Sequence, residues 1–102
     1  HLNNIDNEIK QNVQSDEKNW MRFEENFDIV YGGFLTKLYE LFPNLTLVEK
    51  RICAYIKMGL SSKEISSLLN LSIRSIETSR YRLRKKLDLS RDVNLPDFLQ
   101  QL

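Results

Sequence analysis

Apolar side chains recur at helical spacing through the first half of the chain. The stripe runs through Trp20, Phe23, Phe27 and Val30 and continues through Phe34, Leu38 and Leu41 or Phe42. Two adjacent glycines, Gly32 and Gly33, interrupt it, and each glycine inside a helix costs about 1 kcal/mol. The pattern therefore predicts two helices with a break at the glycines, forming a helical extension over residues 20–44.

The first 19 residues are polar and contain a sparser stripe. Leu2, Ile5, Ile9 and Val13 lie three or four residues apart. This spacing is compatible with a short coiled coil, and the polarity is equally compatible with a linker. We leave both interpretations open for residues 1–19.

Capping chemistry predicts four helices in the second half. Thr46 with Glu49 and Ser61 with Glu64 match the capping box, while Ser72 and Asn94 can each cap a further helix. Gly59 and Asn70 are suited to the left-handed conformation that ends a helix. The predicted helices are Leu47–Met58, Ser62–Leu69, Ile73–Leu87 and Leu95–Leu102. Residues 45–102 thus form an all-α domain in which a short helix, a three-residue turn and a longer helix make a helix-turn-helix.

Charge is segregated along the chain, although the formal net charge is only +1. Residues 1–45 have four basic and eight acidic side chains, whereas residues 46–91 have eleven basic and four acidic ones. The helical wheel of residues 73–87 places Ile73, Ile76, Leu83 and Leu87 in one buried arc. The opposite face consists of Arg74, Thr78, Tyr81, Arg82 and Lys85. Such a face can neutralise phosphates and hydrogen-bond base edges, which favours contact with double-stranded DNA.

Glu77 is the one acidic residue among six basic ones in residues 74–86. Its carboxylate could accept a hydrogen bond from a cytosine amino group. Alternatively it pairs with Arg74 or Arg80, three residues away on either side. Both interpretations stay open at this point.

Other function classes find little support in the composition. The chain has one cysteine, Cys53, in an apolar helical pattern that predicts burial in the core, and one histidine, His1. We therefore expect no metal site, no cofactor, no small-molecule ligand and no catalytic residues. We find no signal peptide and no apolar run near the ~20 residues that span a bilayer, so we expect a cytoplasmic location.

The second half resembles the LuxR/GerE-type DNA-binding domain of bacterial response regulators and sensors. The resemblance rests on Leu45-Thr46 with Glu49, the run from Gly59 to Ile65, Leu71-Ser72, Ser75-Ile76 and Arg84-Lys85-Lys86-Leu87. It implies a four-helix domain whose third helix enters the major groove and whose fourth helix mediates dimerisation.

The resemblance also implies roles for individual residues. Base contacts fall on Glu77, Thr78 and Tyr81, and phosphate contacts fall on Lys63, Arg74 and Ser75. The chain departs from the family at Ser79, where histidine is usual, and at Glu77 and Tyr81, where lysine is common. The family's typical target sequence is therefore not transferred.

Residues 20–45 resemble the extension of a subgroup in which this domain ends a larger sensory regulator, often a membrane-associated one. We therefore expect an upstream part and a role in signal transduction, with RNA polymerase as a further candidate partner. We also predict a homodimer on DNA, formed through the helix after Pro96 or through the N-terminal stripe. Two alternatives remain. One is region four of a sigma factor, and the other is a helical adaptor that binds an acidic protein. An enzyme fits the sequence least.

Overall fold

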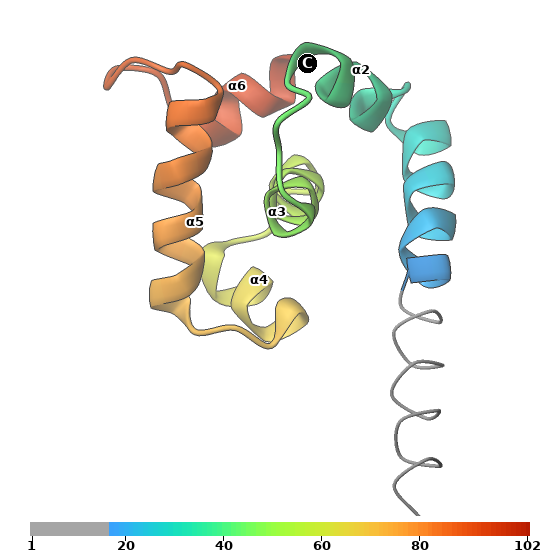
Figure 1. Cartoon of the computed structure of the whole chain (residues 1–102), viewed down its shortest axis with the longest axis horizontal. Coiled ribbons are helices and arrows are strands. Elements are labelled where there is room, and N and C mark those ends of the chain that lie inside the picture. Colours follow the sequence, from blue (N-terminus) through green and yellow to red (C-terminus); the bar gives the residue numbers. More distant parts are fainter. Residues whose placement is uncertain (1–16) are drawn as a thin grey trace, which may run out of the picture. The chain divides into compact units, whose positions relative to one another are not determined.

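The computed structural model describes residues 17–102, which contain helices and no strands (Figure 1). The apolar stripe predicted from Leu2 to Val13 lies outside the described residues. The chain divides into two compact units, one ending at Phe34 and the other beginning at Leu35. The all-α prediction is confirmed, and each unit is described separately below.

The first unit contains a helix over residues 17–30, with aromatic rings stacked along one face. Ring centroids of Trp20 and Phe23 are 4.8 Å apart, and those of Phe27 and Tyr31 are 4.3 Å apart. The helix stops before Gly32 and Gly33, which have φ values of 66° and 79°. The predicted break is confirmed, because both glycines adopt the left-handed region that other residues avoid.

The prediction that Val30 continues this buried stripe is wrong. Its side chain is 75% exposed. Val30 lies about 60° around the helix from Phe27, at the edge of the stripe. Tyr31, one position further, stacks on Phe27 instead.

The second unit is built from five helices, of which the first begins at the unit boundary. Their bounds are α2 Phe34–Leu41, α3 Leu47–Lys57, α4 Ser62–Leu69, α5 Ile73–Lys86 and α6 Leu95–Gln101. The predicted bounds of α4 are confirmed, and those of α3, α5 and α6 differ by one residue at the C-terminal end. On α2, Leu38 is buried and Leu41 is exposed, whereas Phe42 packs edge-on against Phe98 with centroids 6.3 Å apart.

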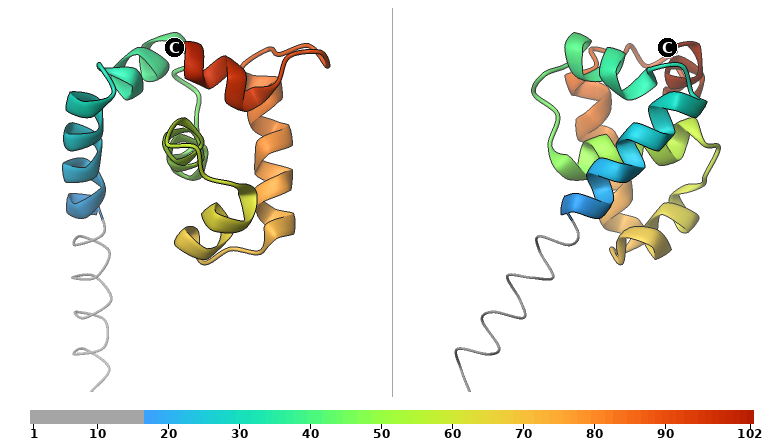
Figure 2. Two further views of the ribbon diagram at one scale, coloured as in Figure 1. Left: turned by 180° about the vertical axis from the view of Figure 1, so that it is seen from behind. Right: turned by 90° about the vertical axis from the view of Figure 1, so that its right-hand side faces the viewer.

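Helix α3 lies at the centre of this unit, against α5 and α6, while α4 packs on α5 (Figure 2). Fully buried aliphatic side chains fill the space between these helices: Ile52, Ile56, Ile65, Ile76, Leu83 and Leu99. Cys53 is also buried, as predicted. Burial removes about 25 cal/mol of unfavourable hydration per Å² of apolar surface, so this cluster fixes α5 onto the centre of the domain.

The predicted caps are present at the start of each helix from α3 to α6. Both capping boxes are formed, by Thr46 with Glu49 and by Ser61 with Glu64. Ser72 and Asn94 accept hydrogen bonds from backbone amides of α5 and α6. Each cap satisfies amides that the first turn leaves without a helical partner.

The C-terminal ends of α3 and α6 cap one another. Lys57 Nζ donates to the carbonyl oxygens of Leu99 and Gln100, at 3.2 and 2.8 Å. In return, Gln100 Nε2 donates to the carbonyl oxygens of Ile56 and Lys57, at 3.3 and 2.9 Å. Carbonyls that lack partners within each helix are thereby satisfied across the contact.

The prediction that Ile73 belongs to the buried arc of α5 is wrong, because its side chain is 49% exposed. Leu83 and Leu87 lie about 20° from Ile76 on the helical wheel, but Ile73 lies about 60° away. The middle of the arc is therefore buried, and its edge faces solvent.

Asn70 ends α4 in the left-handed conformation, with φ 54° and ψ 43°. A residue with a Cβ and no local hydrogen-bonding side chain is disfavoured there by about 1–2 kcal/mol. We expect Asn70→Ala to lower the free energy of unfolding by that amount in urea denaturation. Asn70→Gly should cost far less, because glycine adopts positive φ freely. Equal losses in the two variants would contradict this account of the turn.

Candidate nucleic-acid interface

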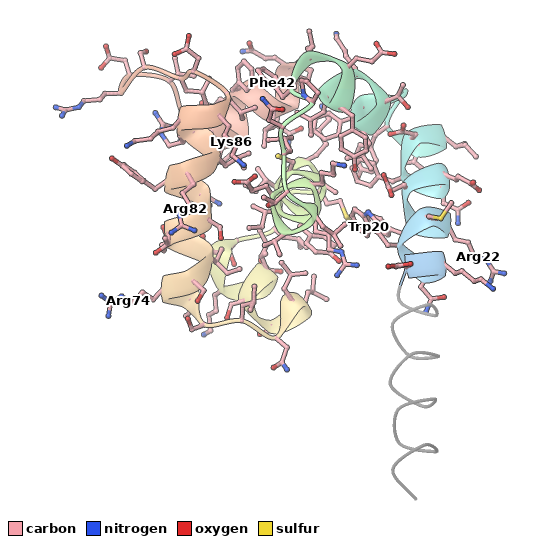
Figure 3. The ribbon with its side chains drawn as sticks, viewed as in Figure 1. Trp20, Arg22, Phe42, Arg74, Arg82 and Lys86 are labelled. Carbon is pink, nitrogen blue, oxygen red and sulfur yellow. The ribbon has the colours of Figure 1, made fainter. Side chains whose placement is uncertain are left out.

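Helix α5 presents a polar, positively charged face to solvent (Figure 3). The five residues predicted for this face are all exposed: Arg74, Thr78, Tyr81, Arg82 and Lys85. Because Ile76, Leu83 and Leu87 fix the opposite side in the core, the exposed face has a defined orientation on the domain.

The three remaining candidate residues are also exposed. Ser75 and Glu77 lie on α5, and Lys63 lies in the first turn of α4. The Ser75 hydroxyl is 2.9 Å from that of Ser72, so it belongs to the cap of α5. The structure thus places seven of the eight predicted contacts on one helix and the eighth at the start of the preceding helix.

Five of the six basic residues of α5 divide into two groups. Arg84 donates to the carbonyl oxygens of Val93 and Ser90, at 2.6 and 2.7 Å, and so holds the loop that leads to α6. Lys86 forms an ion pair with Glu49. Arg74, Arg82 and Lys85 form no ion pair within residues 17–102. The ammonium group of Lys85 lies 4.7 Å from the centre of the Tyr81 ring, and no carboxylate of the described residues neutralises its charge.

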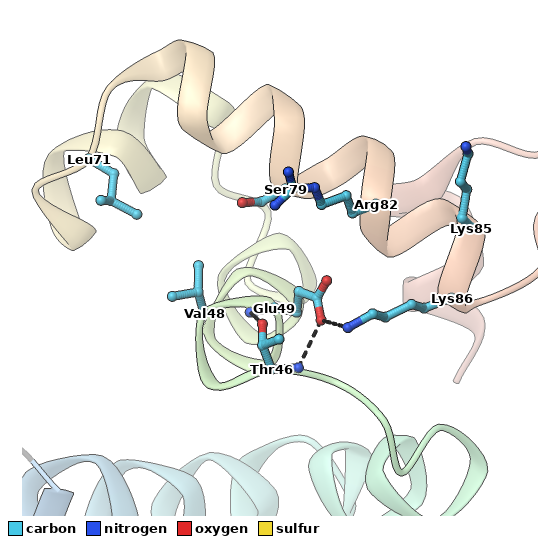
Figure 4. Close-up of a pocket in the computed structure, with 8 residues that line it drawn as sticks. All are labelled: Thr46, Val48, Glu49, Leu71, Ser79, Arg82, Lys85 and Lys86. Carbon is cyan, nitrogen blue, oxygen red and sulfur yellow. Dashed lines mark hydrogen bonds and ion pairs between the residues drawn. The ribbon is translucent and has the colours of Figure 1, made fainter.

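Lys86 connects the end of α5 to the start of α3 (Figure 4). Its ammonium group donates to Glu49 Oε1 at 2.7 Å and to the Asn44 carbonyl oxygen at 3.1 Å. The same carboxylate oxygen accepts from the Thr46 amide at 2.8 Å. Glu49 therefore acts both as capping residue and as the ion-pair partner that positions α5. Sequence reasoning identified only the capping role, because the partner lies 37 positions away.

The environment of Glu49 favours its charged form, although the residue is buried. Burial raises the pKa of Glu49, but the hydrogen bonds from Lys86 and Thr46 outweigh that effect, so its pKa lies below the ordinary 4.5. Burial, together with the Glu49 charge, raises the pKa of the Cys53 thiol to about 12. Cys53 is therefore an uncharged core residue.

Glu77 stands apart from its basic neighbours. It is exposed, and within the described residues it forms no ion pair with Arg74 or Arg80. Of the two interpretations of this residue, ion pairing along the helix receives no support from the structure.

Two hollows lie along the exposed face of α5. The larger, of about 640 Å³, lies between α5 and the start of α3; it is lined by Thr46, Val48, Glu49, Leu71, Ser79, Arg82, Lys85 and Lys86 (Figure 4). The smaller, of about 340 Å³, is lined by Ser72, Arg74, Ser75, Thr78, Ser79 and Arg82. Ser79 and Arg82 line both, so the hollows adjoin. Sequence reasoning noted Ser79 only as a departure from the family and Leu71 only as part of the family resemblance, and it assigned no role to Val48.

Residues 17–102 contain no cluster of three or more potential metal ligands among their His, Cys, Asp and Glu side chains. None of its helices has the length and hydrophobicity needed to cross a bilayer.

Residues 43–99, more than half of the chain, match the family described as bacterial regulatory proteins, luxR family. The chain belongs to the luxR family. Neither a comparison with curated proteins nor one with solved structures gives a match. Membership of the luxR family supports the function of a DNA-binding transcription regulator. The matched segment contains α3, α4, α5 and most of α6, so the four-helix domain predicted from the sequence is confirmed as a luxR-type domain.

The contact between Lys86 and Glu49 predicts a specific pattern of stability in this luxR-family chain. Lys86→Met leaves a buried carboxylate without its charged partner, so we expect the free energy of unfolding to fall by about 1–3 kcal/mol. Glu49→Gln preserves a capping box. Adding it to Lys86→Met should restore part of the loss, which a double-mutant cycle in urea measures.

The same pair predicts a pH dependence. Because the pKa of Glu49 is lowered in the folded state, its stabilising contribution is complete above the unfolded-state pKa and is lost as pH falls through the folded-state value. In Lys86→Met the ion pair is absent, and burial of Glu49 disfavours its charged form. Protonation of Glu49 at low pH therefore destabilises this variant less than it destabilises the parent chain. The difference from the parent chain should therefore shrink between pH 7 and pH 3. A constant difference would contradict the proposed ion pair.

Proposed function

We propose that this chain regulates transcription by binding specific DNA sequences, with α5 lying in the major groove. The observation that supports this most directly is the division of the α5 cations. Arg84 and Lys86 hold the fold together, whereas Arg74, Arg82 and Lys85 are exposed on the outward face without an ion pair in the described chain. An α-helix about 10–12 Å wide fits a major groove about 12 Å wide.

Within this proposal, Glu77, Thr78 and Tyr81 contact base edges. All three are exposed along the middle of α5. Glu77 can only accept hydrogen bonds when ionised, and the cytosine amino group is the major-groove donor on a G·C pair. We therefore assign Glu77 to a cytosine and expect a G·C pair at that position of the binding site.

Lys63, Arg74 and Ser75 contact phosphates in the proposed complex. They lie in the first turns of α4 and α5, where backbone amides and helix dipoles also favour anions. These contacts orient the domain without selecting a sequence. Because genomic DNA is the ligand, we place this part of the protein in the bacterial cytoplasm, as the output end of a signalling protein.

We further propose that the chain binds DNA as a homodimer. Family resemblance points to α6, but no large apolar side chain of α6 is exposed in the described chain. In contrast, the helix of residues 17–30 exposes Met21 and Ile29, the latter by 82%. Lys18, Met21, Arg22 and Glu25 surround a shallow hollow of about 370 Å³ on this helix. Two antiparallel copies would pair Glu25 of each with the basic residues of the other.

The base-contact assignment is tested by selecting binding sites from a random duplex library with the parent chain and with single variants. Thr78→Ala, Tyr81→Ala and Glu77→Ala should each relax one position of the selected site, with a loss of about 1–3 kcal/mol against the parent site. Lys63→Ala should weaken binding to all DNA sequences alike. It should also make the slope of log K against the logarithm of the salt concentration less steep by about 0.9. Lys37→Ala, an exposed lysine of α2 outside the proposed DNA and dimer contacts, is the matched control.

Three outcomes of that experiment decide against the proposal. Uniform losses from all four variants would remove the base-reading roles. Salt-insensitive binding, or no binding to DNA at any salt concentration, would favour an adaptor for an acidic protein.

A homodimer predicts that the selected site contains two half-sites about one helical turn apart. Ile29→Asp should abolish dimerisation in sedimentation experiments and weaken binding to the full site, because it places a carboxylate in the apolar contact. Asp97→Lys on α6 should leave the dimer intact. The reverse pattern would assign dimerisation to α6, and a parent chain that binds a single half-site as a monomer would contradict the dimer.

A further inference from the structure

The larger hollow beside α5 combines apolar and cationic walls. Val48, from the first turn of α3, and Leu71, from the turn before α5, are each 38% exposed. Arg82 and Lys85 line the side formed by α5, and Figure 4 shows Arg82 lying along α5 above the start of α3. The groove formed by these residues, called here the strand groove, has a volume of about 640 Å³.

The carboxylate within the strand groove does not oppose an anionic ligand strongly. Glu49 is buried and its charge is compensated by Lys86 at 2.7 Å. Arg82 and Lys85 have no such partner among residues 17–102. The uncompensated charge of the groove is therefore positive, beside side chains that favour contact with apolar surface.

This combination restricts the occupant. An occupant that covers Val48 and Leu71 with apolar atoms while it presents anions to Arg82 and Lys85 would match both walls of the groove. A DNA strand has this composition, because apolar deoxyribose rings alternate with phosphates. We propose that the strand groove holds one sugar-phosphate strand at the edge of the major groove that α5 enters. The inference rests on the proposed function and specifies which part of the DNA this side of α5 contacts.

The strand groove is continuous with the face assigned to DNA. Ser79 and Arg82 line both this groove and the smaller hollow that contains Arg74, Ser75 and Thr78. A strand leaving the base-contacting face would therefore pass Arg82 next. We assign Arg82 to a phosphate, and Ser79, half-buried between the two hollows, to a hydrogen bond with the same strand.

The test uses the complete chain and the duplex selected with it, in which single phosphates are replaced by uncharged methylphosphonates. At one or two positions flanking the base-contacted segment, replacement should weaken binding by the parent chain roughly 10-fold, the effect of one charge-assisted hydrogen bond. Arg82→Ala should show the same loss on unmodified DNA and little further loss on the modified duplex. For Arg82→Ala, the slope of log K against the logarithm of the salt concentration should be less steep by about 0.9. Arg91→Ala, exposed on the loop before α6, is the matched control and should behave like the parent chain.

A second variant separates DNA contact from folding. Val48→Glu places a carboxylate in the first turn of α3, where it favours the helix dipole, so the domain should remain folded. It should nevertheless weaken binding to all DNA sequences several-fold, because the new charge faces a phosphate. Val48→Gln, of similar size and uncharged, should have the smaller effect.

Different results would overturn the strand-groove proposal and the proposed DNA binding. If Arg82→Ala and the parent chain lose the same affinity at every methylphosphonate, the strand groove is not the phosphate site, even though the base variants still relax specificity. If Val48→Glu leaves DNA affinity unchanged but abolishes transcription activation, the groove binds a protein instead. Both results overturn the proposal. If the parent chain shows no preference among DNA sequences, the proposed function itself is overturned.

Discussion

The ion pair between Lys86 and Glu49 joins the C-terminal end of α5 to the first turn of α3. Glu49 closes the capping box at the start of α3, and Lys86 is the last residue of α5. Because Lys86 also donates to the carbonyl oxygen of Asn44, the connection between α2 and α3 is part of the same arrangement. A charge buried here without a partner would be costly, so the pair restricts how α5 lies on the core.

The same arrangement determines which positive charges are available to a ligand. Lys86 and Arg84 point their charged groups at the domain's own carboxylate and carbonyl oxygens. Arg74, Arg82 and Lys85 remain on the exposed face of α5, next to Thr78 and Tyr81. A charged face of this kind attracts a polyanion over several ångströms. Membership of the luxR family and this charge distribution point independently to DNA.

Aliphatic packing complements the electrostatics. Ile76 and Leu83 are fully buried on α5, and Ile65 is fully buried on α4, so the two helices of the helix-turn-helix share one core. Asn70, in the left-handed conformation, ends α4 and begins the turn between the two helices. In our proposal, this pair of helices places the middle of α5 against the base edges of the DNA. It also places the groove beside Arg82 against the phosphates of one strand.

The sequence by itself determined the helices from α3 to α6, because capping boxes, left-handed ends and apolar periodicity act over three or four residues. It also determined which face of α5 is charged. Wheel positions at the edge of a stripe, Val30 and Ile73, were predicted wrongly, since their burial depends on neighbours that periodicity does not describe. Only the tertiary structure decided that Lys86 meets Glu49, that Arg84 holds the loop before α6, and that Val48 and Leu71 border one groove. Those contacts join residues from different helices or loops, and no local pattern encodes them.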